Sequence, residues 1–203
     1  HKEFLNENSC CHGTGMESHF KYADMVYAHQ EEKLYVNLFV KSRLNWEEAG
    51  ITIRQKTEME TPESVILEVE SQKGIPMYIR IPGWSGEERR IWLDGVEQKG
   101  WPEEDGYIQM DVPEGRHEIR CLFPCGFYLE AAPDRPELNT LLYGPYVLAA
   151  LSGEQDFLEL NIDSQKADEE VRKTGLEFQY RDLIWKPLFD IEEETFQVYW
   201  KKI

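Results

Sequence analysis

The spacing of hydrophobic residues changes once along this 203-residue chain, near residue 31. Before that point, apolar residues recur at the spacing of one face of a helix: Met16, Phe20, Ala23 and Tyr27. The sequence TGME places Thr14 as an N-cap and Glu17 three residues later, which is the pattern of a capping box. The sequence therefore predicts a helix over about residues 15–29.

After residue 31 the period of the pattern becomes two, and Pro and Gly turns separate the segments. Asp94-Gly95 is typical of a hairpin turn, and the polar segment 164–175 predicts an exposed loop or short helix. Ten or more short strands at this spacing favour a β-sandwich, so we expect a mainly β chain with less than about a fifth of its residues helical. The expected strands are 34–40, 51–57, 64–70, 77–81, 90–98, 107–112, 117–123, 141–151, 156–162, 176–180 and 195–200.

Charge narrows the range of partners. The chain carries 39 Asp and Glu against 22 Lys and Arg, a formal net charge of -17, which would repel nucleic acid and an anionic membrane surface. The pattern contains no apolar run of transmembrane length and no signal-peptide core near the N-terminus. The first residue is His rather than Met, so we expect a piece of a longer protein.

Cys10 and Cys11 are the most informative of the four cysteines. They lie just ahead of the predicted helix, whose N-terminal dipole favours the thiolate form, and a thiolate is both a nucleophile and a zinc ligand. Two adjacent cysteines supply at most half of a tetrahedral zinc shell, with His12, distant residues or a missing segment as sources of the rest. Two small residues that pack at a helix start remain the structural alternative.

Several segments together resemble a known family. In order along the chain these are CCHGTGMESHFKYADMVYAH, LYVNLFVKS, MYIRIPGW, GYIQMDV, LLYGPYVLAA and PLFDIEEETFQVYW. They resemble the C-terminal part of glycoside hydrolase family 127 and of its relative family 146, the β-L-arabinofuranosidases. The resemblance spans nearly the whole chain, and its most specific piece is the opening Cys-Cys-x-Gly-x-Gly-Met-Glu-x-His.

The resemblance implies a retaining glycosidase whose active site lies in an upstream (α/α)6 barrel. Residues 1–30 would be the last helical segment of that barrel, and residues 31–203 a β-sandwich (jelly-roll-like) region. By the same resemblance, Cys10 is the nucleophile and a Zn²⁺ ligand, and Cys11 is a second ligand. The acid/base Glu and the other ligands would lie upstream, so this fragment alone is expected to be inactive. Its partners would be a carbohydrate substrate and the barrel.

Other residues are weaker candidates for function. His19 shares a predicted helix face with Met16 and would point into the barrel as a possible substrate-pocket residue, although a lone histidine on such a face is commonly part of the core. Glu17 is most simply the capping-box acid. Cys121 alternates with apolar neighbours and is expected in the core, and we do not expect CLFPC (residues 121–125) to form a second zinc site.

Trp84 and Trp101 lie beside Gly or Pro and can stack on sugar rings or anchor turns. A non-catalytic β-sandwich that binds carbohydrate or braces a barrel is therefore the alternative function, with Cys10 and Cys11 as remnants. The upstream sequence of the parent gene would distinguish the two. The sugar and the cell compartment stay open.

Overall fold

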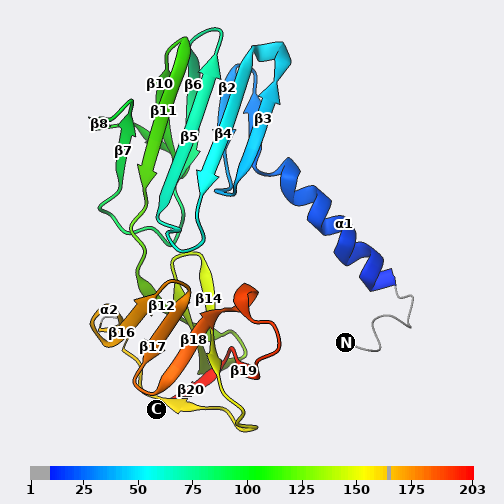
Figure 1. Cartoon of the computed structure of the whole chain (residues 1–203), viewed down its shortest axis with the longest axis vertical. Helices are drawn as coiled ribbons and strands as arrows, with labels where there is room; N and C mark the ends of the chain where they lie inside the picture. Colours follow the sequence, from blue (N-terminus) through cyan, green and yellow to red (C-terminus); the bar gives the residue numbers. More distant parts are fainter. Residues whose placement is uncertain (1–9, 164–165) are drawn as a thin grey trace. The chain divides into compact units, whose positions relative to one another are not determined.

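The computed structural model describes residues 10–163 and 166–203, and most of its elements are strands (Figure 1). Strands hold 53% of the residues and helices 10%. The expected mainly β, sandwich-type fold with a minor N-terminal helix is confirmed. No helix within the described ranges is long and apolar enough to cross a membrane.

The chain divides into two compact units. The first consists of residues 1–57, 65–81 and 91–120, and the second of residues 58–64, 82–90 and 121–203. The predicted division at residue 30 separates a barrel remnant from everything after it, and it stays a prediction.

The first unit contains two β-sheets. Figure 1 draws β2, β6 and β10 behind β4, β5 and β11. The five-stranded sheet has the order β1-β2-β6-β10-β9, with β2 parallel to β6, and the six-stranded sheet has the order β3-β4-β5-β11-β7-β8. The bounds are β1 Tyr27–Gln30, β2 Lys33–Val36, β3 Ser42–Trp46, β4 Ile51–Thr57, β5 Ser64–Ser71, β6 Ile75–Arg80, β7 Arg90–Leu93, β8 Val96–Gln98, β9 Glu103–Glu104, β10 Tyr107–Val112 and β11 Gly115–Leu122.

Alternating burial explains why these segments form strands. In β4, Ile51 and Ile53 are buried while Thr52 and Arg54 are not, and β5 buries Val65 and Leu67 in the same way. Each strand thus gives one apolar face to the core and one polar face to water, which is the condition under which the period of two fixes the register.

The second unit is built around one large sheet with the order β15-β20-β13-β14-β18-β17-β16. Strand β12 pairs with β13, and β19 pairs with β14. Its core contains Phe178, Trp185 and Trp200, all fully buried. The bounds are β12 Phe127–Ala132, β13 Arg135–Tyr143, β14 Tyr146–Leu151, β15 Glu159–Leu160, α2 Ala167–Glu170, β16 Val171–Thr174, β17 Glu177–Tyr180, β18 Leu183–Pro187, β19 Phe196–Gln197 and β20 Trp200–Lys202; short 3-10 turns are η1 Glu47–Ala49 and η2 Leu188–Asp190.

The N-terminal helix differs from its prediction at both ends. Helix α1 spans Cys10–Asp24 rather than residues 15–29, so Thr14 is not its N-cap. The Thr14 carbonyl instead accepts a hydrogen bond from Ser18 Oγ at 3.1 Å, inside the helix. Glycine in a helix costs only roughly 0.5–1 kcal/mol relative to alanine, which does not stop the helix at Gly15. At the other end, backbone pairing with β2 makes residues 27–30 a strand.

Two predicted strands are each divided in two. The segment 141–151 contains a Gly144-Pro145 turn, and Tyr143 pairs with Tyr146 across it. The segment 195–200 becomes the separate strands β19 and β20. Segment 164–175 contains the four-residue helix α2 and also the unexpected strand β16. The Asp94-Gly95 hairpin is confirmed, since Leu93 pairs with Val96.

Candidate functional site

The backbone of α1 places the two adjacent cysteines at the start of a helix. Cys10 and Cys11 are its first two residues, not residues ahead of it as the sequence predicted. The first N–H groups of a helix have no partner inside the helix, and its dipole favours negative charge at that end. Although the helix begins earlier than predicted, its N-terminus still favours the thiolate form of cysteines at these positions.

The side chains of these candidates lie outside the described residues. This applies to Cys10, Cys11, His12 and His19, so their predicted roles stay predictions. Among the residues whose side chains the structure describes, no three His, Cys, Asp or Glu groups gather closely enough to hold a metal ion. The donor set of two neighbouring thiols nevertheless suits half of a zinc shell, with the other half drawn from elsewhere.

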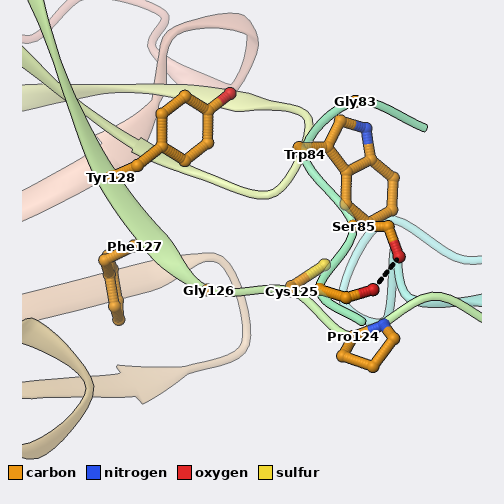
Figure 2. A pocket seen from close by; sticks show the side chains of 9 residues that line it. Gly83, Trp84, Ser85, Pro124, Cys125, Gly126, Phe127 and Tyr128 are labelled. Carbon is orange, nitrogen blue, oxygen red and sulfur yellow. Dashed lines mark hydrogen bonds between the residues drawn. The ribbon is translucent and has the colours of Figure 1, made fainter. Parts of the chain in front are cut away.

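Among the described side chains, an open hollow in the second unit brings together two residues that the sequence singled out, Trp84 and Cys125 (Figure 2). It measures about 590 Å³, and residues 83–86 and 124–128 line it. The first segment is a turn, in which Ser85 N–H donates to the Pro82 carbonyl at 3.0 Å. Gly86 N–H donates to the Pro124 carbonyl at 3.0 Å and so ties the two segments together.

Trp84 both anchors its turn and faces the hollow. Its ring meets that of buried Phe123 edge-on, with centroids 6.5 Å apart and planes at 84°. The residue is half-buried, and Figure 2 shows its ring across the hollow from Tyr128. The sequence offered sugar stacking and turn anchoring as alternatives for Trp84, and the geometry is compatible with both at once.

Cys125 contributes a neutral thiol to the lining of the hollow. Burial is the largest cause that raises its pKa to about 12, and the nearby negative charge of Glu63 raises it further, while Lys173 opposes the shift. A thiol with such a pKa keeps its proton at neutral pH, so it is neither a nucleophile nor a soft metal ligand under those conditions. Cys125 therefore differs in chemistry from what is predicted for Cys10.

Cys121 occupies the core position that the sequence predicted. It is fully buried in β11, and burial raises its pKa to about 12.

Trp101 belongs to the first unit, is half-buried and donates from Nε1 to Glu103 Oε1 at 3.3 Å. It therefore does not share the hollow with Trp84. Glu17 is exposed in the interior of α1, so it is not the capping-box acid that the sequence predicted.

Sequence reasoning missed β12 and with it Tyr128. Phe127 and Tyr128 are neighbours on this strand, so their side chains leave opposite faces. Phe127 packs against the core through Tyr143, with ring centroids 4.8 Å apart, while the Tyr128 hydroxyl donates to the Gly144 carbonyl at 3.2 Å. The aromatic segment FYL between Gly126 and Pro133 was the available signal.

Part of this chain matches a known protein family. Residues 33–117 match the middle domain of the glycoside hydrolase family 127 β-L-arabinofuranosidases. A search of curated proteins finds no match. This match to the middle domain confirms the resemblance to family 127.

Solved structures match the fold over most of the chain. A family 127 β-L-arabinofuranosidase from Geobacillus stearothermophilus T6 matches with a TM-score of 0.65 at 15% identity, over 90% of this chain and 35% of its own. A family 127 β-arabinofuranosidase gives 0.61 at 17% identity, over 88% and 36%, and a glycoside hydrolase gives 0.64 at 14%, over 87% and 37%. The chain thus spans little more than a third of the length of these proteins.

Proposed function

Because residues 33–117 match the middle domain of family 127 β-L-arabinofuranosidases, we propose that this chain is the C-terminal portion of a retaining glycoside hydrolase that acts on β-L-arabinofuranosides. The observation that carries the proposal is this match, which is separated by residues 25–32 from α1, the helix whose first two residues are Cys10 and Cys11. The catalytic barrel, its acid/base carboxyl group and the remaining metal ligands lie upstream of this chain in the proposed parent.

Cys10 is the nucleophile in this proposal, and Cys11 is a ligand. Zinc, when bound by both sulfurs and by upstream ligands, keeps the thiols deprotonated near neutral pH. The N-terminus of α1 acts in the same direction, because its unpaired N–H groups favour negative charge.

The reaction proceeds as two displacements. Cys10 Sγ forms a bond to the anomeric carbon while the bond from that carbon to the leaving oxygen breaks, and the upstream carboxylic acid gives its proton to that oxygen. Water then attacks the same carbon, the carboxylate takes a proton from the water, and the carbon–sulfur bond breaks. Two inversions retain the anomeric configuration, as in glycosidases that use a carboxylate nucleophile.

Substitution in the full-length parent separates the two cysteines. We expect Cys10→Ser to remove nearly all turnover even with zinc retained, because a serine hydroxyl keeps its proton near neutral pH and is a poor nucleophile without a base. Cys11→Ser should act through loss of zinc, so excess zinc should restore part of the activity. Turnover of an aryl β-L-arabinofuranoside and the metal content of each variant are the measurements.

A mechanism-based label gives an independent readout. A cyclophellitol-type arabinofuranoside analogue that reacts with nucleophilic cysteine should add its mass to the peptide with Cys10. Label on Cys11 or on a carboxylate, or wild-type turnover by Cys10→Ser, would contradict the proposed roles.

A further inference from the structure

The hollow lined by residues 83–86 and 124–128 has the geometry of a ligand site. We propose that it is a binding site for an uncharged saccharide, in which a sugar ring packs against Trp84 and Tyr128. The choice of an arabinose saccharide as probe rests on the proposed function, whereas the site itself rests on the geometry of the hollow.

Two aromatic rings give the hollow its walls. Both rings line the hollow, and Figure 2 shows the Tyr128 ring on the left and the Trp84 ring on the right. Sugar rings present apolar C–H faces and hydroxyl edges, and aromatic rings with a polar tip match both. Within the described residues the Trp84 indole N–H makes no hydrogen bond and is therefore available to a sugar hydroxyl.

The lining is uncharged in a strongly acidic chain. No Lys, Arg, Asp or Glu is among the lining residues. Cys125 and Tyr128 are the titratable residues of the lining, and burial is the largest cause that raises both pKa values, so both groups are neutral at physiological pH. With a net charge of -17 over the whole chain, an anionic ligand would be repelled and a neutral one would not.

The walls are held in place before any ligand arrives. The Tyr128 hydroxyl is fixed by its 3.2 Å hydrogen bond to the Gly144 carbonyl, and the Trp84 ring by its contact with Phe123. The 3.0 Å bond from Gly86 N–H to the Pro124 carbonyl connects the two lining segments. Side chains that need no reordering lower the entropy lost on binding.

The size of the hollow and its glycines fit a chain of sugars. A volume of about 590 Å³ lies within the roughly 300–1,000 Å³ of small-molecule sites. A Cβ built on Gly126 would meet no atom within 4 Å, so glycine there keeps space open rather than relieving strain. The hollow is open to solvent, which suits binding to the middle of a saccharide as well as to its end.

Titration of the 203-residue chain with a neutral arabinose trisaccharide tests the proposal. In ¹H–¹⁵N spectra we expect the indole signal of Trp84, assigned through Trp84→Phe, to move with the saccharide. Calorimetry gives the Kd of the same complex. A galacturonate trisaccharide of equal length but negative charge should bind much more weakly, and equal binding would contradict the electrostatic argument.

Two kinds of variant locate the site. Trp84→Ala removes a wall, and Gly126→Leu fills the hollow without a clash at its Cβ; each should raise the Kd about fivefold or more. Tyr128→Phe keeps the ring and should bind nearly as well as the wild type, whereas Tyr128→Ala should not.

Matched controls separate binding from folding. Gly153→Leu places the same side chain at another position whose Cβ meets nothing within 4 Å, and Trp101→Ala removes a half-buried tryptophan of the other unit. Both should leave the Kd unchanged. Thermal unfolding of each variant shows whether it is folded; if Trp84→Ala is not, Gly126→Leu decides.

Three results would overturn the proposal: no movement of the Trp84 signal at saturating saccharide, equal losses in the control variants, or a dimer of this chain that covers the hollow and dissociates in Gly126→Leu. Cys10→Ala should bind the saccharide like the wild type. Failure of saccharide binding alone therefore removes the saccharide site, while failure of the Cys10 experiments alone removes the proposed catalytic roles.

Discussion

Gly144 occupies a position that a larger residue cannot take without strain. Its φ is +51°, in the left-handed region, and a Cβ there would lie 2.6 Å from Cys125 Sγ and 3.3 Å from Cys125 Cβ. Its carbonyl also receives the Tyr128 hydroxyl. The short YGP motif, which the sequence showed only as part of a family resemblance, thus has a local physical explanation.

We expect Gly144→Ala to destabilise the second unit by about 1–3 kcal/mol, because it combines left-handed strain with overpacking against Cys125. Cys125→Ala should recover part of that loss in the double variant, since it removes the 2.6 Å contact with Sγ but leaves the backbone strain and the 3.3 Å contact with Cβ. Urea denaturation of the four proteins gives the coupling free energy.

Gly153→Ala is the matched control for that cycle. Gly153 has no positive φ and no atom within 4 Å of a built Cβ, so its substitution should be nearly neutral. If Gly144→Ala is as stable as Gly153→Ala, the account of the YGP turn is wrong.

At the scale of elements, one aspartate joins a hairpin to the neighbouring strand. Asp94 begins the β7–β8 turn with a φ of +51°, and its Oδ1 accepts a hydrogen bond from Glu118 N–H of β11 at 2.8 Å. Its Oδ2 lies 2.7 Å from His117 Nδ1. The hydrogen bond from His117 is the largest cause that lowers the pKa of Asp94, and the same bond is the largest cause that raises the pKa of His117.

This pair makes the stability of the first unit depend on pH. Because folding raises the pKa of His117, this group contributes stability that is fully present below pH 6.5, its ordinary pKa. That contribution is lost as pH rises through the higher pKa of the folded protein. Because folding lowers the pKa of Asp94, this group contributes stability that is present above pH 3.8, its ordinary pKa. That contribution is lost as pH falls through the lower pKa of the folded protein. We expect Asp94→Asn to lower the urea midpoint most at about pH 5, and less at about pH 9, where the imidazole is neutral.

Asn keeps an acceptor for Glu118 N–H and tolerates a positive φ, so Asp94→Asn mainly removes the charge. Asp105→Asn is the control, because Asp105 also has a φ of +51° before a glycine but, within the described residues, has no histidine partner. Its effect should not change between the two pH values. An Asp94→Asn effect that is equally independent of pH would contradict the role of the pair.

At the scale of the whole molecule, the chain contains part of a proposed active site. Helix α1 carries two cysteines at its start, while the matched solved structures are nearly three times as long as the part that this chain covers. Two thiols leave a tetrahedral zinc site half complete, and the proposed acid/base group lies upstream.

We therefore expect the purified 203-residue chain not to hydrolyse an aryl β-L-arabinofuranoside, with or without added zinc. The full-length parent, assayed alongside, is the positive control. Turnover by the chain that disappears in Cys10→Ser would show that the site is complete without the upstream residues.

The sequence predicted strand bounds correctly where one face of the strand is buried and the other is not. Residues 51–57 and 107–112 form β4 and β10 with the predicted bounds, because their alternation is uninterrupted. Strand β12 was missed because the side chains of FYL are all half-buried, which gives no period of two. The Asp-Gly turn was predictable from the left-handed preference of its residues, whereas Gly144-Pro145 was concealed inside a continuous apolar segment.

The sequence by itself determined the fold class, the hairpin at Asp94 and the core position of Cys121, because each depends on local periodicity or on the conformational preference of single residues. Tertiary structure decided where α1 begins and ends, since pairing between β1 and β2 replaces helical hydrogen bonds at residues 27–30. It also decided that Trp84, Cys125 and Tyr128 share one hollow while Trp101 does not. Those three residues come from segments about forty positions apart, and only the packing of the second unit brings such segments together.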